Sequence, residues 1–177
     1  MADPRTSSLR NRRGVTLVEL LIGAAILAIA VTAILGAYFT QMTLTEHTRN
    51  VAWGANDASR VMERLRRQNT GAACTVPSAA APAGFGSWDA WLANTTANGG
   101  GGKSIQPNPA VNELVVVTPS GVDPMTITVA VCWRQRNQTW GECTWNGAAL
   151  VPNPAAGGNP AVTESTTMLS TFMTCRR

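Results

Sequence analysis

The sequence predicts an α+β fold in which a long N-terminal helix packs on a four-stranded antiparallel sheet. An unbroken apolar run fills residues 15–39, and an amphipathic helical pattern continues from there to about residue 70. Short β-branched, alternating segments appear only after residue 110. Strand patterns that follow a helical pattern, rather than alternate with it, are typical of the α+β class. The 177 residues suffice for one domain of ordinary size plus an extended segment.

Residues 1–14 form a short basic leader without a periodic apolar pattern. Arg5, Arg10, Arg12 and Arg13 outnumber the one acidic residue, Asp3, so the leader has a net charge of four minus one, +3. Arginines directly before an apolar helix keep that end of the helix in the cytoplasm. The leader therefore predicts the orientation of the segment that follows it.

The apolar run of residues 15–39 is 25 residues long and carries a single charge, Glu19. A helix needs about 20 apolar residues to cross a bilayer. The hydrophobic core of a signal peptide is shorter, roughly 7–15 residues. A buried core helix is the alternative, but cores rarely use so uniformly apolar a stretch. We therefore expect a transmembrane helix, with the rest of the chain in the periplasm or outside the cell.

The helix should continue through residues 40–70 with one apolar face. The predicted face recurs at alternating three- and four-residue steps and consists of Leu44, Thr48, Val51, Ala55, Ala58, Met62 and Leu65. Glu63 and Arg67 are spaced for an i,i+4 ion pair, and Gly71 is the predicted stop. The whole helix would have some 50 residues and a length of about 80 Å.

Residues 71–177 should form the head. The stretch 75–109 is rich in Ala, Gly, Pro, Asn and Ser, and Ser87 can cap a short helix that contains Trp88, Trp91 and Leu92. Strands are predicted at 114–117, 125–133, 139–145 and 162–174, with a loop at 152–160. Four sequential strands most simply form an antiparallel meander, one face of which would cover the amphipathic helix.

The four cysteines point to disulfides in an oxidising compartment. Cys74, Cys132, Cys143 and Cys175 form no CxxC pair, and one histidine cannot complete a Cys/His zinc site, so no metal or cofactor is expected. A hairpin turn at residues 137–138 would place Cys132 opposite Cys143, within disulfide range. Cys74 could then pair with Cys175, although four cysteines allow three connectivities.

The chemistry of the chain is concentrated in residues 12–21, RRGVTLVELL. An ionised glutamate in a membrane helix is costly and requires a partner. Cleavage after Gly14 would create an amino group on Val15, and helix packing would bring Glu19 of one subunit near the Val15 amine of the next. Only one stagger brings these charges together, so the pair would set the axial register.

This segment resembles the N-terminal cleavage and methylation motif of type IV prepilins and of type II secretion pseudopilins. In that family a prepilin peptidase cuts after the glycine, the new N-terminal residue is methylated, and the glutamate guides assembly. The resemblance implies that Gly14 is the cleavage residue, Val15 the methylated residue and Glu19 the assembly residue. The family usually has Phe or Met where Val15 stands. Residues 56–67 and the strand ITVAVCWRQ resemble the PilV branch of minor pilins, and the fold expected by resemblance is pilin-like.

Other signals in the sequence have simpler explanations. From Thr70 onward five basic residues balance five acidic ones, so a nucleic-acid-binding face is not expected. GGGGKS at 99–104 lacks the first glycine of a phosphate-binding loop, because Ala97 stands there. His47 is expected to be solvated. The helix arginines Arg60, Arg64, Arg66 and Arg67 form a solvated face, or one that contacts neighbouring subunits or anionic lipid heads.

These observations together predict a structural protein and not an enzyme, with neither a catalytic site nor a small-molecule substrate. The expected function is that of a minor type IV pilin, which is held in the inner membrane and then enters a pilus at the cell surface. Its partners would be other pilin subunits and the prepilin peptidase, which also acts as the methyltransferase. The alternatives are a type II secretion pseudopilin, a pilus-tip adhesin or DNA-uptake component, and a single-span membrane enzyme or sensor.

Overall fold

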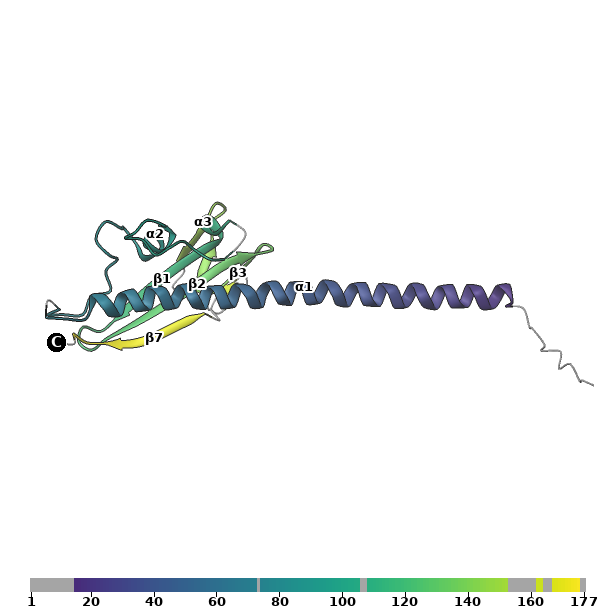
Figure 1. Cartoon of the computed structure of the whole chain (residues 1–177), viewed down its shortest axis with the longest axis horizontal. Helices are drawn as coiled ribbons and strands as arrows, with labels where there is room; N and C mark the ends of the chain where they lie inside the picture. Colours follow the sequence, from purple (N-terminus) through teal and green to yellow (C-terminus); the bar gives the residue numbers. More distant parts are fainter. Residues whose placement is uncertain (1–14, 73, 106–107, 153–161, 164–166, 176–177) are drawn as a thin grey trace, which may run out of the picture. The chain divides into compact units, whose positions relative to one another are not determined.

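The computed structural model describes residues 15–72, 74–105, 108–152, 162–163 and 167–175. The chain divides into two compact units, residues 1–45 and 46–177. In the described part, one long helix is followed by two short helices and seven strands (Figure 1). A long helix followed by a small antiparallel sheet is the predicted α+β, pilin-like architecture.

Helix α1 spans Leu17–Gln68, 52 residues, and confirms the predicted helix of some 50 residues. No proline interrupts the segment, and Arg66 and Arg67 in its last turn suit the negative end of the helix dipole. The helix ends three residues before the predicted stop at Gly71. Gly71 instead adopts a left-handed conformation, with φ of +103°, which glycine reaches without strain.

The buried face of α1 in the head differs from the predicted one. Ala58, Met62 and Leu65 are buried as expected, but Ala55 and Thr48 are exposed, and Leu44 is 60% exposed. The prediction was wrong at these three positions because helical spacing alone does not show which side chains find tertiary partners.

Polar and small residues of α1 are buried in place of the residues that were predicted to face inward. Asn50 and Asp57 are buried, and both are hydrogen-bonded, Asn50 to Gln135 and Asp57 to Ser104. Gly54 is also buried, because Thr167 approaches to 3.3 Å from the position that a Cβ atom would take. Tertiary partners therefore decide which face of the helix turns inward.

The main sheet is built around the longest strand, β2, Met125–Gln135. β1, Glu113–Ser120, pairs with β2 antiparallel along its whole length, from Glu113 opposite Trp133 to Ser120 opposite Thr126. β3, Gln138–Trp140, and β7, Met168–Met173, share the other edge of β2, again antiparallel, at opposite ends of it. The two-residue strand β6, Val162–Thr163, pairs with β3 in parallel.

The predicted meander order is therefore wrong at its last strand. β3 covers only three residues of β2, Trp133–Gln135, so the backbone of Met125–Ala130 remains open to β7. The predicted third strand, 139–145, is divided at Gly141, which has φ of +105°. Its second half, β4, Cys143–Trp145, pairs instead with β5, Leu150–Pro152, in a separate two-stranded sheet. Of the predicted loop at 152–160, residues 153–160 lie outside the described residues.

The core of the head lies between the sheet and the buried face of α1. Ile127, Val129, Val131 and Trp133 alternate along β2, are fully buried and belong to one cluster with Val61 and Leu65. The short helix α2, Trp88–Ala93, adds Trp88, Trp91 and Leu92 to this cluster. As predicted, Ser87 caps α2, its side chain accepting a hydrogen bond from the Ala90 amide. A third short helix, α3, Pro109–Asn112, leads into β1.

The cysteines form two disulfides, Cys74–Cys175 with a Cα–Cα distance of 5.4 Å and Cys132–Cys143 with 6.3 Å. The second pair does not arise from the expected hairpin. The turn lies at Arg136 and Asn137, both with positive φ, one residue earlier than predicted, and Trp133 pairs with Trp140. Cys132 is therefore level with residue 141, and the chain bends back at Gly141 to bring Cys143 to it.

Candidate functional site

The start of α1 is built by a side-chain cap. Thr16 Oγ1 accepts a hydrogen bond from the Glu19 amide at 3.3 Å, and Thr16 O accepts one from the Leu20 amide at 3.1 Å. Ser or Thr followed three residues later by Glu is the capping-box pattern of helix N-termini. The sequence contains this pattern as Thr16 to Glu19, although Thr16 was not among the predicted site residues. Gly14, the predicted cleavage residue, lies outside the described residues.

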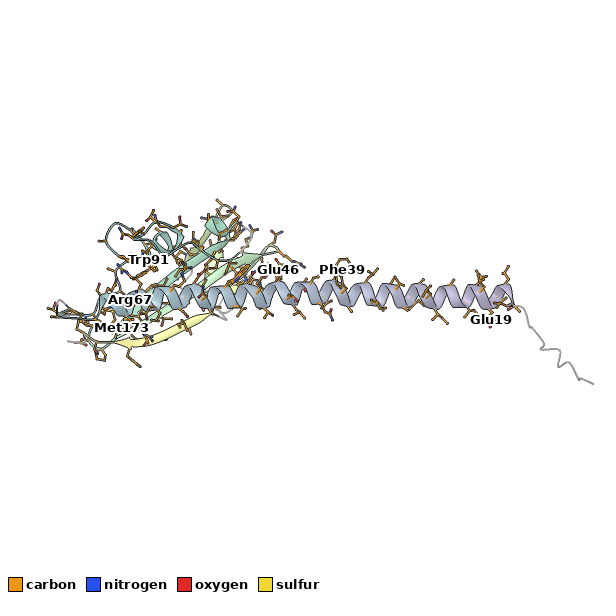
Figure 2. The ribbon with its side chains drawn as sticks, in the orientation of Figure 1. Glu19, Phe39, Glu46, Arg67, Trp91 and Met173 are labelled. Atoms are coloured by element: carbon orange, nitrogen blue, oxygen red, sulfur yellow. A yellow bond between two sulfur atoms is a disulfide. The ribbon has the colours of Figure 1, made fainter. Side chains whose placement is uncertain are left out.

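Glu19 lies in the first turn of α1, where a carboxylate suits the positive end of the helix dipole (Figure 2). Its side chain is exposed and makes no hydrogen bond or ion pair with the residues that the structure describes. Val15 is also exposed, at 70%. Glu19, the predicted assembly residue, and Val15, the predicted methylated residue, are therefore both accessible to groups of another chain.

The apolar part of α1 is exposed throughout. Every residue from Val15 to Met42 is exposed, including Leu17 at 75% and Ile29 at 70%. By length and composition this helix can cross a membrane. An exposed apolar surface of this extent needs lipid or other apolar helices around it.

Residues 9–35 match the family model of the prokaryotic N-terminal methylation motif. The chain carries a prepilin-type N-terminus. The matched segment contains Gly14, Val15 and Glu19, and it ends within the apolar part of α1. The chain matches no curated protein and no solved structure. The prepilin-type N-terminus supports a type IV pilin-like or pseudopilin protein, in which the apolar helix anchors the chain in a membrane.

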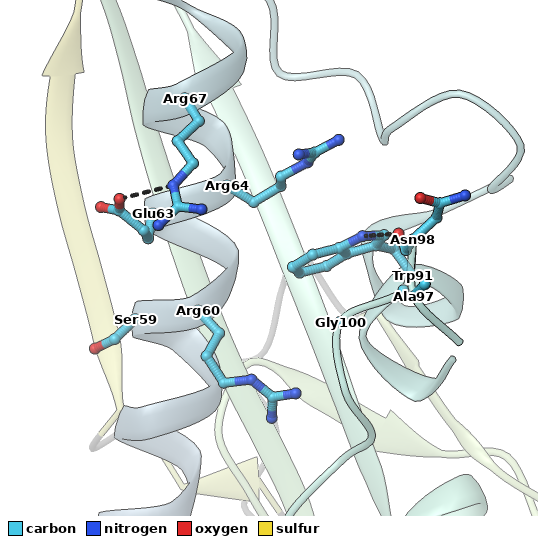
Figure 3. A pocket seen from close by; sticks show the side chains of 10 residues that line it. Ser59, Arg60, Glu63, Arg64, Arg67, Trp91, Ala97, Asn98 and Gly100 are labelled. Atoms are coloured by element: carbon cyan, nitrogen blue, oxygen red, sulfur yellow. Dashed lines mark hydrogen bonds and ion pairs between the residues drawn. The ribbon is translucent and has the colours of Figure 1, made fainter. Parts of the chain in front are cut away.

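The head carries an open groove of about 520 Å³, which we call the arginine-lined groove (Figure 3). One side is the exposed face of α1, with Ser59, Arg60, Glu63, Arg64 and Arg67. The opposite side is Trp91 of α2 and the loop of residues 97–100. The sequence predicts that the arginines share one helix face, but only the folded chain places a loop opposite them.

Two of the three arginines in the groove already have acidic partners. Arg60 Nη1 lies 2.6 Å from Asp57 Oδ1 and donates to Gly102 O at 2.8 Å. Arg67 Nε lies 3.0 Å from Glu63 Oε1, which confirms the predicted i,i+4 pair. Arg64 makes no hydrogen bond or ion pair with any described residue. The groove therefore has a positive charge that the head itself does not neutralise.

Asp57, the partner of Arg60, belongs to a pair of buried carboxyl groups with Glu113. Asp57 accepts hydrogen bonds from the amide and the hydroxyl of Ser104, at 2.8 and 2.9 Å, in addition to the bond from Arg60. Glu113, 1% exposed, accepts one from the Ile105 amide at 2.9 Å. These bonds tie α1, the 101–105 loop and β1 together.

Burial raises the pKa of Glu113 from its usual 4.5 to about 8. The bond from the Ile105 amide opposes this pKa shift, whereas the neighbouring Asp57 carboxylate adds to it. The Ile105 amide binds Glu113 Oε2, whereas Glu113 Oε1 is buried without a hydrogen-bond partner among the described residues. At neutral pH Glu113 is therefore mostly protonated.

The GGGGKS segment has a structural role in the head. Lys103 is buried, with 3% of its side chain exposed, and its Nζ contacts Asp89 Oδ1 at 2.7 Å and Glu113 O at 2.6 Å. Gly100 and Gly102 donate to the carbonyl groups of Trp91 and Leu92 at the end of α2. The lysine is thus committed to protein groups and is not presented to a phosphate.

His47 is half-buried, so the expectation that it is solvated was wrong. Its ring lies against Trp140, with centroids 4.4 Å apart, and its Nδ1 is buried without a hydrogen-bond partner among the described residues. No cluster of three His, Cys, Asp or Glu side chains that could hold a metal ion occurs in the described ranges.

Proposed function

We propose that the chain is a minor subunit of a type IV pilin-like filament, made as a precursor and cut after Gly14. The observation that carries the proposal is the methylation motif over residues 9–35, placed where an exposed apolar helix begins. In this proposal the membrane stores the processed subunit. Extraction into a filament then moves the apolar part of α1 from lipid into a bundle of like helices.

Glu19 would guide this transfer. A charged carboxylate among apolar helices costs about 2.5–3.5 kcal/mol at the centre of a membrane, and less near its surface. The amino group of Val15 on a neighbouring subunit is a cation that processing itself creates. Pairing with it would remove the cost only at one stagger, which would set the axial position of each subunit. In this proposal the subunit has no catalytic role of its own.

The motif equally supports a pseudopilin of a type II secretion system, which shares the processed N-terminus. A chain that functions in secretion would be required for export of a substrate protein, whereas a minor pilin would be required for pilus number. Deleting the gene, counting the surface pili and measuring the amount of secreted protein distinguishes a minor pilin from a pseudopilin. A single-span enzyme or sensor would instead keep its leader.

The experiment that tests the proposal is the intact mass and N-terminal residue of the chain purified from membranes, with and without the host's prepilin peptidase. We expect a start at Val15 that depends on the peptidase, with one added methyl group. A start at Met1 in both strains would contradict the proposal. A start at Val15 without the added mass would show that the chain is processed but not methylated.

A further inference from the structure

The arginine-lined groove is a charged concavity of the described head that the prepilin-type N-terminus does not explain. We propose that it is a docking site for a carboxylate side chain, Asp or Glu, of a neighbouring protein subunit. This inference rests on the proposed function, because a neighbour is present only if the chain assembles. It adds a contact made by the head to the contact that Glu19 makes through the helix.

The first observation that supports a docking site for a carboxylate is the guanidinium group of Arg64, which is unpaired among the described residues. Its guanidinium group makes no hydrogen bond or ion pair with the described residues, and it extends from α1 toward the side of the groove that carries Trp91 and Asn98 (Figure 3). A guanidinium group presents a planar fork of donors that matches a carboxylate in a bidentate arrangement. A carboxylate entering the groove would meet this unused fork first.

Arg67 is available as a second donor at small cost. Its ion pair with Glu63 is exposed, with 71% and 53% of the two side chains accessible. Exposed pairs of this kind are worth about 0–1 kcal/mol. An incoming carboxylate can therefore recruit Arg67 beside Arg64. Arg60 is less available, because its partner Asp57 is fully buried.

The opposite wall of the groove is already ordered. Trp91 Nε1 donates to Asn98 O at 3.1 Å, and the Gly100 amide donates to Trp91 O at 2.7 Å. These donors are used within the head, so the wall supplies shape and the arginines supply the charge. A preformed wall lowers the entropy that binding would otherwise cost.

The number of free charges favours a single carboxylate over a polyanion. Specific nucleic-acid binding commonly uses about 6–10 phosphate contacts, and lipid-binding clusters contain about 4–8 exposed basic residues. The groove has one arginine without a partner and one that can be recruited. Beyond Thr70 five basic residues balance five acidic ones, so this part of the chain adds no net positive charge to the groove.

The weakness of such a contact favours a protein over a free small acid. Hydrogen bonds that involve charged groups contribute about 1.5–3 kcal/mol each, which corresponds to millimolar affinity for one or two of them. Such a contact becomes occupied when a larger interface already holds its partner in place. Within an interface, charge pairs chiefly set orientation and partner choice.

The test is site-specific photocrosslinking of the full chain in intact cells. A photoreactive residue replaces Ala97, which is exposed at the edge of the groove, and in a control it replaces Ala148, which is exposed elsewhere on the head. Each is combined with Arg64→Glu or with Arg66→Glu. Arg66 is also exposed, lies on the same helix and undergoes the same charge change, but it does not line the groove.

We expect crosslinks from position 97 to a peptide of another subunit that contains Asp or Glu. Arg64→Glu should lower their yield about tenfold, the effect of about 1.4 kcal/mol, whereas Arg66→Glu should leave the yield within about twofold. Changing the captured acidic residue of the other subunit to Lys should restore the crosslinking yield of the Arg64→Glu variant. Equal yields at positions 97 and 148, a response to both arginines, or capture of lipid or nucleic acid would overturn the inference.

The mass of the chain in the same cells separates the two proposals. If the chain starts at Val15 and enters filaments but gives no crosslink that depends on Arg64, the docking inference fails and the proposed function survives. If the chain starts at Met1, the proposed function fails first.

Discussion

Two glutamates show how this chain handles a carboxyl group in apolar surroundings. Glu19 is exposed at the start of the apolar helix and has no partner among the described residues. Glu113 is 1% exposed and lies beside Asp57 and Lys103. In the proposed assembly Glu19 finds its partner on another chain. Glu113 instead takes up a proton, because burial raises its pKa.

Replacing Glu19→Gln should leave cleavage intact and impair assembly. The amide cannot form an ion pair with the Val15 amine of a neighbour, so we expect normal mature mass in the membrane and at least about tenfold less of the chain in sheared filaments. Loss of an interaction of about 1.4 kcal/mol suffices for this effect. Glu46→Gln makes the same chemical change on the same helix, at a residue paired with Arg136. It should enter filaments normally, and equal loss by both variants would contradict the role of Glu19.

Replacing Glu113→Gln should change how the stability of the head depends on pH. The folded chain holds a proton on Glu113 up to a pKa of about 8, while the unfolded chain releases it near 4.5. The stability that depends on this proton is therefore complete below pH 4.5 and is lost as the pH rises from there to about 8. Glutamine stays neutral, so the loss should be absent from the variant.

The measurement is the free energy of denaturant unfolding of the full chain in detergent at pH 5 and pH 9. We expect wild type to lose more stability between these two values than Glu113→Gln does. Glu63→Gln, an exposed position, should retain the wild-type pH dependence. Parallel curves for wild type and Glu113→Gln would show that Glu113 is ionised in the folded head.

At the scale of elements, the order of helices and strands along the chain was predictable from the sequence. The pairing partners of the strands were not. The long helix, the Ser87 cap of α2 and the strands β1 and β2 follow from periodicity, capping chemistry and β-branched runs. These signals are local. The pairing of β7 with β2 rather than with β3 depends on how little of β2 is covered by β3. No short-range pattern contains that information.

The glycine loop that forms one wall of the groove should tolerate side chains poorly. A Cβ atom at Gly100 would lie only 2.5 Å from Leu92 Cα, a backbone atom that cannot move aside without shifting α2. We expect Gly100→Ala to destabilise the head by about 1–3 kcal/mol, the usual cost of overpacking. Thermal unfolding of the full chain in detergent measures this.

Gly86→Ala provides the matched control for Gly100→Ala. A Cβ atom at Gly86 would meet no atom within 4 Å. We expect this variant to unfold at or slightly above the wild-type temperature, because alanine reduces the entropy of the unfolded chain. An unchanged melting temperature for Gly100→Ala would mean that the loop can move away from α2.

At the scale of the whole molecule, the two disulfides should differ in what they contribute. Cys74–Cys175 closes a loop of 101 residues that contains all seven described strands, whereas Cys132–Cys143 spans 11. In the chain-entropy description the first cross-link contributes about 5 kcal/mol and the second about 3 kcal/mol. We expect Cys74→Ala with Cys175→Ala to be the more destabilising pair in denaturant unfolding. The reverse order would show that local packing around Cys132 outweighs loop closure.

The sequence by itself determined the prepilin-type N-terminus, the apolar helix and the α+β class, because these depend on composition and on spacings within a few turns of chain. The tertiary structure alone decided the inward face of α1, the position of β7, the protonated Glu113 and the groove. Each of these requires groups far apart in the sequence: Asp57 meets Ser104, and Arg64 faces the loop after α2. Burial and hydrogen-bond partners exist only once the chain has folded, so the free energies that choose between a buried and an exposed polar residue are not properties of local sequence.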